Sequence, residues 1–241
     1  MDKKATDEYI ERFRSAIDDE DRGQYKDIEV KVITGGKHVL DTGYYVVGGD
    51  AQVNIPNPGG DTNVLVVDHA QLTTNGYNGH PYVVADDHGL VNIDFGGSVI
   101  AKGDSRVNAA WDVFLLITEN AASKSVGCHV KMWDNSTGEI VDCQEADIHD
   151  NAEAHVNGVG HIRCRDNSKV RVTDCGWVDA FDDAEVVATG ASKVSAWRRS
   201  KVDARDSTTV YLYHDAVCDP AEGGIVAVIR RTGNPWDYER I

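Results

Sequence analysis

The chain repeats a pattern of eight residues, most clearly from Asn167 to Arg230, in which apolar places alternate with places of any character. Eight consecutive blocks, such as NSKVRVTD and DAEVVATG, fill this stretch. The fourth place is Val or Cys and the sixth is mostly Ala, Val or Leu, whereas the fifth varies freely. Apolar residues two apart are typical of a strand with one buried face. Places eight, one and two hold small or turn-forming residues, so each block predicts one short strand followed by a turn.

The outward places indicate how many strands make one coil, because side chains one coil apart stack about 4.8 Å from each other. At a spacing of sixteen residues, the third place gives a ladder of alternating charge and the seventh gives an aromatic ladder. These ladders are Glu153, Lys169, Glu185 and Lys201, and Phe181, Trp197 and Tyr213. A spacing of twenty-four residues mixes the two kinds of side chain. We therefore expect two strands per coil, with three strands per coil as the alternative.

A run of strands closed by three-residue corners, with no helical spacing between them, resembles the parallel β-helix, or β-solenoid. More loosely, it is similar to the octad-repeat proteins of bacteria and their phages. The resemblance covers about two thirds of the chain and implies an all-β solenoid fold. The motif itself carries no chemistry, so the resemblance implies no functional residue.

The first residues predict an amphipathic helix. Thr6 followed by two acidic residues is a helix start, and apolar residues then recur on one helical face at Tyr9, Ile10, Phe13, Ala16 and Ile17. We expect this helix to cap the first coil, since an open solenoid end exposes unpaired strand edges. A helix that binds a partner is the alternative.

These patterns divide the chain into four parts. They are a capping helix in 1–24, irregular first coils with longer loops in 25–79, the regular octad solenoid in 80–230, and a C-terminal cap or tail in 231–241.

Length and composition are those of a chain with one elongated core, at 241 residues and 41% hydrophobic content. No apolar run suits a signal peptide or a membrane span, so we expect a cytoplasmic protein, in the host cytoplasm if a phage encodes it. Cys164 and Cys218 fall at inward places, and Cys128, Cys143 and Cys175 fall at corners. We expect all five to be reduced packing residues.

The net charge of −16 is concentrated in the middle of the chain. Residues 80–158 carry 13 acidic and 4 basic side chains, whereas the last third is nearly neutral. Such a field repels a nucleic-acid backbone, so we expect no direct binding of nucleic acid and no membrane partner. A basic protein surface is the partner that the charge favours.

Acidic residues recur at the eighth place, where Asp tolerates corner conformations and bonds to its own turn. The candidate binding residues are Asp134, Asp142, Asp150, Asp166, Asp174 and Asp182, together with the aromatic ladder Phe181, Trp197 and Tyr213. Four of the acids, Asp134, Asp150, Asp166 and Asp182, would form one edge of carboxylates. EF-hand, HExxH and GxSxG spacings are absent from the sequence, so we expect no catalytic residue, no metal and no cofactor.

The leading hypothesis is a non-catalytic intracellular protein that acts through a rigid acidic surface. A phage- or mobile-element-encoded inhibitor that mimics nucleic acid against a host enzyme or defence complex fits this description, by analogy only. The alternative is a tail-spike-like β-helix that binds or cleaves carbohydrate. Its candidate groups are Asp86, Asp87 and Asp94 with Arg163, Arg165 or Arg171, which are far apart in the repeat.

Overall fold

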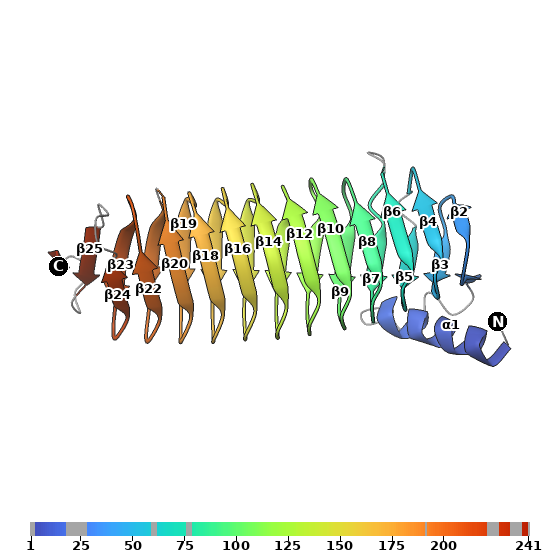
Figure 1. Cartoon of the computed structure of the whole chain (residues 1–241), viewed down its shortest axis with the longest axis horizontal. Helices are drawn as coiled ribbons and strands as arrows, with labels where there is room; N and C mark the ends of the chain where they lie inside the picture. Colours follow the sequence, from blue (N-terminus) through green and yellow to red (C-terminus); the bar gives the residue numbers. More distant parts are fainter. Residues whose placement is uncertain are drawn as a thin grey trace. The chain divides into compact units, whose positions relative to one another are not determined.

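The structure is a computed structural model that describes residues 3–17, 28–58, 62–75, 79–190, 192–220, 227–231 and 238–240. The chain forms two compact units, Met1–Ser123 and Lys124–Ile241, which we call the N-terminal and C-terminal units. In each unit the strands alternate between two parallel sheets, A and B, so that one coil contributes one strand to each sheet (Figure 1).

The N-terminal unit contains the helix, six strands of sheet A and five of sheet B. The helix is α1 (Lys3–Ile17), and sheet A has the order β1 (Lys31–Ile33), β3 (Tyr44–Val47), β5 (Asn63–Val66), β7 (Tyr82–Ala85), β9 (Ser98–Ala101) and β11 (Phe114–Ile117). Sheet B has the order β2 (Lys37–Val39), β4 (Gln52–Ile55), β6 (Gln71–Thr74), β8 (Leu90–Ile93) and β10 (Arg106–Ala110). Strand β12 (Ala122–Val126) spans the boundary between the units.

The C-terminal unit repeats the same architecture more regularly. Sheet A has the order β13 (His129–Met132), β15 (Glu145–Ile148), β17 (His161–Cys164), β19 (Trp177–Ala180), β21 (Lys193–Ala196), β23 (Thr209–Tyr213) and β25 (Ala227–Arg231). Sheet B has the order β14 (Thr137–Val141), β16 (Glu153–Asn157), β18 (Lys169–Thr173), β20 (Glu185–Thr189), β22 (Lys201–Ala204) and β24 (Val217–Pro220). Strand β26 (Tyr238–Arg240) pairs antiparallel with β25, and most of the tail predicted as a cap lies outside the described residues.

The pairing of the strands confirms two strands per coil. Lys169 is in register with Glu153 on one side and with Glu185 on the other, which in turn pairs with Lys201. The charge ladder is therefore a real column of neighbouring side chains, sixteen residues apart. The early coils are longer, because Tyr44 pairs with Asn63 and Asn63 with Tyr82, at spacings of nineteen residues.

The fourth and sixth places of each block face the solenoid interior, as predicted, and second-place residues such as Ala184 and Ser200 are buried as well. Val186 and Val194 are at most 1% exposed, and Ala188 and Ala196 are fully buried. All five cysteines are free thiols, and burial raises the pKa of Cys218 to about 11. Burial also raises the pKa of the enclosed Cys164 thiol, so these side chains pack as neutral groups.

Helix α1 lies along the outer face of sheet A in the N-terminal unit (Figure 1). The sequence analysis instead predicted a cap over the open end of the first coil. Phe13, 1% exposed, packs with Val46, Leu65, Val67 and Val84. These residues of sheet A point outward, so β3, β5 and β7 are buried on both faces. The helix is therefore a cover for a second, external apolar layer.

Val186→Asp or Val194→Asp should prevent folding, because a lone charge in this interior costs several kcal/mol against a total stability of about 5–15 kcal/mol. The matched control is Glu185→Gln, which changes an exposed side chain of the same strand as Val186. Far-UV circular dichroism and denaturant unfolding would measure the effect. A normally folded Asp variant would contradict the register.

Candidate functional site

The predicted carboxylates lie at corners where the backbone must adopt a left-handed conformation. We call the turn after each strand of sheet A the first corner and the turn after each strand of sheet B the second corner. At the first corner of the C-terminal unit, one residue per coil has φ between 56° and 62°. These residues are Asp134, Asp150, Asp166, Asp182, Arg198 and His214. Asp accepts this conformation more readily than most residues, so the structural reason for Asp at the eighth place is confirmed.

The corner carboxylates also bind the coil before them. Asp150 Oδ2 accepts the backbone N–H of Asp134 at 3.3 Å, and Asp166 Oδ2 accepts that of Asp150 at 3.4 Å. The same arrangement occurs in the N-terminal unit, where Asp68 Oδ2 accepts the N–H of Gly49 at 2.9 Å. The carboxylates of Asp68, Asp150 and Asp166 are thus held in place by a neighbouring coil.

The structure separates the six predicted acids into two sets. Asp134, Asp150, Asp166 and Asp182, which we call the carboxylate row, share the first corner one coil apart. Asp142 and Asp174 lie at the second corner, where they alternate with Gly158 and Gly190 at positive φ. Only the first set forms a continuous row, as the sequence predicted.

Basic residues neutralise one end of the carboxylate row. Arg198 pairs with Asp182, and Arg199 Nη2 lies 2.6 Å from Asp183 Oδ2. Towards the other end, Asp134, Asp150 and Asp166 are exposed. The row therefore has an acidic end and a neutralised end.

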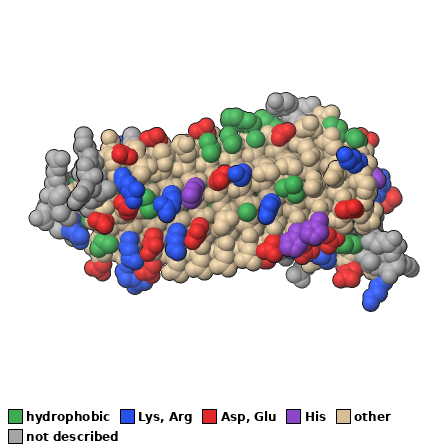
Figure 2. All heavy atoms as spheres, in the orientation of Figure 1, with side chains coloured by type: hydrophobic (Ala, Val, Ile, Leu, Met, Phe, Trp, Pro, Cys, Tyr) green, Lys and Arg blue, Asp and Glu red, His purple; other side chains and the backbone are tan. Residues whose placement is uncertain are grey.

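The flat faces of the C-terminal unit carry acids beside bases. Ion pairs join Lys124 to Glu139, Lys169 to Glu153, Lys201 to Glu185, Arg205 to Asp203, and Arg163 to Glu145 and Asp147. Figure 2 shows basic and acidic side chains interleaved over the face of this unit that it displays. The acids of the flat faces are paired with basic residues. At the first corner, by contrast, exposed carboxylates follow one another from coil to coil.

The predicted aromatic ladder begins at the Asp182 end of the carboxylate row and continues beyond it, with each ring on the residue before the left-handed corner residue. Trp197 and Tyr213 stack at 3.7 Å between ring centroids, and Phe181 and Trp197 at 6.1 Å. The guanidinium of Arg165 lies 5.4 Å from the Phe181 ring centre. Because the rings stack on each other, the ladder stabilises the stacking of coils.

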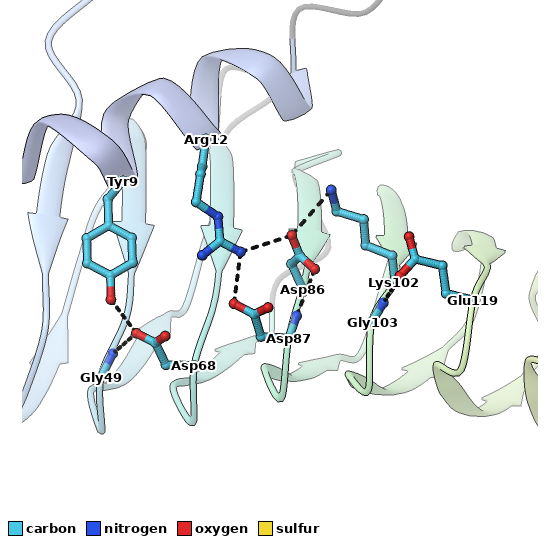
Figure 3. Close-up of polar contacts among 9 residues, drawn as sticks. All are labelled: Tyr9, Arg12, Gly49, Asp68, Asp86, Asp87, Lys102, Gly103 and Glu119. Carbon is cyan, nitrogen blue, oxygen red and sulfur yellow. Dashed lines mark hydrogen bonds and ion pairs between the residues drawn. The ribbon is translucent and has the colours of Figure 1, made fainter. Parts of the chain in front are cut away.

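Sequence reasoning missed a polar cluster that joins α1 to the first corner of the N-terminal unit (Figure 3). The Tyr9 hydroxyl donates a hydrogen bond of 2.5 Å to Asp68, the residue that also receives Gly49 N–H. One coil further, Arg12 Nη2 lies 3.1 Å from Asp86 Oδ2 and 2.8 Å from Asp87 Oδ2. The partners are up to 75 residues apart, so no local pattern reveals them.

Charge in this cluster is compensated. Burial alone would raise the pKa of Asp86, but the N–H of Asp87 and the charges of Lys102 and Arg12 together lower it. Lys102 Nζ lies 3.3 Å from the same carboxylate oxygen that Arg12 contacts. A hollow of about 250 Å³, lined by Glu8, Tyr9, Arg12 and Asp68, adjoins these contacts. The cluster therefore fastens the helix to the corner.

A second group missed by sequence reasoning lies on the outer face of sheet A in the C-terminal unit. Asp179 accepts the indole N–H of Trp177 at 2.9 Å and lies 2.9 Å from His161 Nε2. Tyr211 stacks on Trp177 at 6.0 Å between ring centroids. Of the residues considered for carbohydrate chemistry, Asp86 and Asp87 contact α1, and Arg163 contacts Glu145 and Asp147. Carbohydrate binding or cleavage stays a prediction.

Across the described ranges, no three His, Cys, Asp or Glu side chains are grouped so as to hold a metal ion. Within the same part of the chain, no helix is both long and apolar enough to cross a membrane. Comparison with protein-family models, curated proteins and solved structures found no match.

The Tyr9–Asp68 contact should be visible in a pH titration. The hydrogen bond to Asp68, with burial and the charge of Asp68, raises the pKa of Tyr9 from 10.0 to about 12. Because the folded pKa is the higher one, the contact stabilises α1 docking fully below pH 10 and is lost as the pH rises through about 12. The phenolate absorbance of the native protein minus that of Tyr9→Phe should therefore titrate near pH 12.

Asp68→Asn is the matched variant and should return this titration towards pH 10. Circular dichroism at each pH checks that the strands stay folded. A Tyr9 that titrates near pH 10 in the native chain would show that the contact with Asp68 does not form.

Proposed function

We propose that this protein is a non-catalytic interaction protein that presents the carboxylate row to a basic protein surface. The observation that carries this proposal is the row itself, in which one acid recurs per coil, three of the four are exposed, and Asp150 and Asp166 accept backbone N–H groups of the preceding coil. An ionised carboxylate has about four acceptor positions, and the backbone N–H occupies one of them. At exposed row acids such as Asp150, the other positions can accept hydrogen bonds from Lys or Arg of a partner.

The spacing of the row supports a partner that normally reads a nucleic-acid backbone. Successive carboxylates recur about every 4.8 Å along the coil direction, compared with about 3.4 Å for the phosphates of one strand of duplex DNA. The two charge densities are of the same order, and the row is rigid, so little ordering is needed on binding. A basic groove that binds nucleic acid is therefore the partner surface we propose.

The biological role that fits this surface is inhibition by occupying such a groove. A protein encoded by a phage or mobile element, acting in the host cytoplasm on a nucleic-acid enzyme or defence complex, would use the row in this way. Long-range attraction between the row and the groove would make association fast and sensitive to salt, because the screening length is roughly 8–10 Å in physiological buffers.

A capture experiment with two variants of equal charge tests the proposal. In the row variant, Asp134, Asp150, Asp166 and Asp182 are changed to Asn. In the face variant, Glu139, Glu153 and Glu185 are changed to Gln and Asp203 to Asn, so four acids of the paired face are neutralised. Each variant loses four negative charges from a net charge of −16. Asn also accepts the corner conformation, so the row variant should fold.

We expect the native chain and the face variant to capture the same basic protein from host lysate. The row variant should bind it roughly tenfold or more weakly at low salt, and the native affinity should fall as salt rises. Equal binding of the row variant, or equal loss with the face variant, would contradict recognition through the row. Specific retention of a polysaccharide would favour the carbohydrate hypothesis.

A further inference from the structure

The outward column of sheet A differs in kind between the two units. In the N-terminal unit it is apolar on six paired strands, with Val32, Val46, Leu65, Val84, Ile100 and Leu116 in register. The equivalent column of the C-terminal unit contains Lys131, Asp147, Arg163 and Asp179. Outward places facing water carry charges in one unit, so an apolar column in the other indicates a face that is covered.

Helix α1 covers only part of this apolar column. Val46, Leu65 and Val84 are at most 2% exposed and belong to the cluster around Phe13. Ile100 packs at the margin of the cluster and is half-buried. On the next strand, Leu116 is half-buried and Phe114 is 59% exposed. We call Ile100, Leu116 and Phe114 the open strip.

A large aromatic residue extends the open strip at the second corner. Trp111, three residues before Phe114, is 55% exposed and has φ of 54°, a conformation that is uncommon for a bulky residue. Exposed Trp and Phe beside a covered apolar face are the residue types that dominate binding energy at protein interfaces. The open strip and Trp111 therefore form a surface continuous with the α1 interface.

The α1 interface shows which kind of occupant fits this surface. Three residues of an α-helix rise about 4.5 Å, close to the strand spacing of about 4.8 Å. Tyr9 and Arg12, three residues apart, accordingly reach Asp68 and Asp87, which are corner residues of successive coils. A helix along the coil direction thus places an apolar stripe on sheet A and polar groups on the first corner. Glu119 occupies that corner beside β11 and accepts the N–H of Gly103.

We propose that the open strip binds an amphipathic α-helix of a partner protein, aligned with α1 and continuing its line over β9 and β11. The helix has the chemistry of α1, with an aromatic and aliphatic stripe against Leu116 and Phe114 and a basic residue towards Glu119. This surface is independent of the carboxylate row and of the function proposed for it.

A synthetic peptide of residues 3–17 is a suitable probe, because it has the sequence that the neighbouring part of the same apolar column binds in the chain itself. Its fluorescently labelled form should bind the full-length protein, as measured by fluorescence anisotropy. Phe114→Ser with Leu116→Thr should weaken binding at least tenfold, since both side chains contribute apolar contact. Both changes are at outward places, so circular dichroism and the melting temperature should change little.

Two further variants separate the alternatives. Val39→Ser, at an apolar residue 73% exposed on β2 of sheet B, should leave binding unchanged. Asp68→Asn loosens α1. If the peptide binds more strongly to this variant, and if the Phe114 and Leu116 changes have no effect on binding, then the peptide replaces α1 and the proposal is overturned. Absence of binding to the native chain would also overturn it. A concentration-dependent dimer that disappears with Phe114→Ser and Leu116→Thr would assign the surface to a second copy instead of a partner helix.

Discussion

Closure of the coils in the C-terminal unit depends on one residue per described corner in the left-handed backbone conformation. For residues other than Gly this conformation costs on the order of 1 kcal/mol, and the first corner of the C-terminal unit repeats it at Asp134, Asp150, Asp166 and Asp182. The carboxylates of Asp150 and Asp166 offset part of the cost by accepting a backbone N–H from the previous coil. Where the row ends, Arg198 contacts Asp182 of the previous coil instead. The carboxylate row therefore contributes to the stability of the corners, independently of any role in binding.

Because the coil is narrow, side chains that could bind a partner must lie on its outer surface. With two strands per coil, the interior is filled by residues such as Val186 and Ala188, and the remaining places face outward or form corners. Side chains at the outward places are arranged in two ways in this chain. In the C-terminal unit they form ion-paired or stacked columns such as Glu185 with Lys201. In the N-terminal unit they form an apolar column that requires a helix such as α1 as its cover.

The fold was predictable because its repeat is local and its columns are chemically distinct. Alternating charge at Glu153, Lys169 and Glu185 distinguishes a period of sixteen from one of twenty-four, and the strand register confirms it. The spacing of Tyr9, Ile10 and Phe13 likewise predicted the helix. The position of the helix on sheet A was not predicted. The coils around Tyr44 and Asn63 are nineteen residues long, so they do not follow the octad pattern from which the strand register was inferred. One signal was available. Apolar runs such as Tyr44–Val47 are typical of strands buried on both faces.

The candidate sites were predictable only where the repeat places them. The corner role of Asp150 follows from its place in the octad, whereas its bond to Asp134 N–H depends on three-dimensional contact between coils. Contacts such as Arg12 with Asp87 join distant segments and leave no periodic signal.

The structural role of the carboxylate row would favour the recognition role proposed for it. A flexible acidic side chain must lose rotamer freedom when it binds a partner cation. Asp150 is already fixed by its bond to the preceding coil while remaining exposed, so much of that loss occurs on folding. An acid on the flat face, such as Glu185, would also have to leave Lys201 before it could contact a partner. Both differences favour the corner over the face as the place where this chain would contact a basic surface.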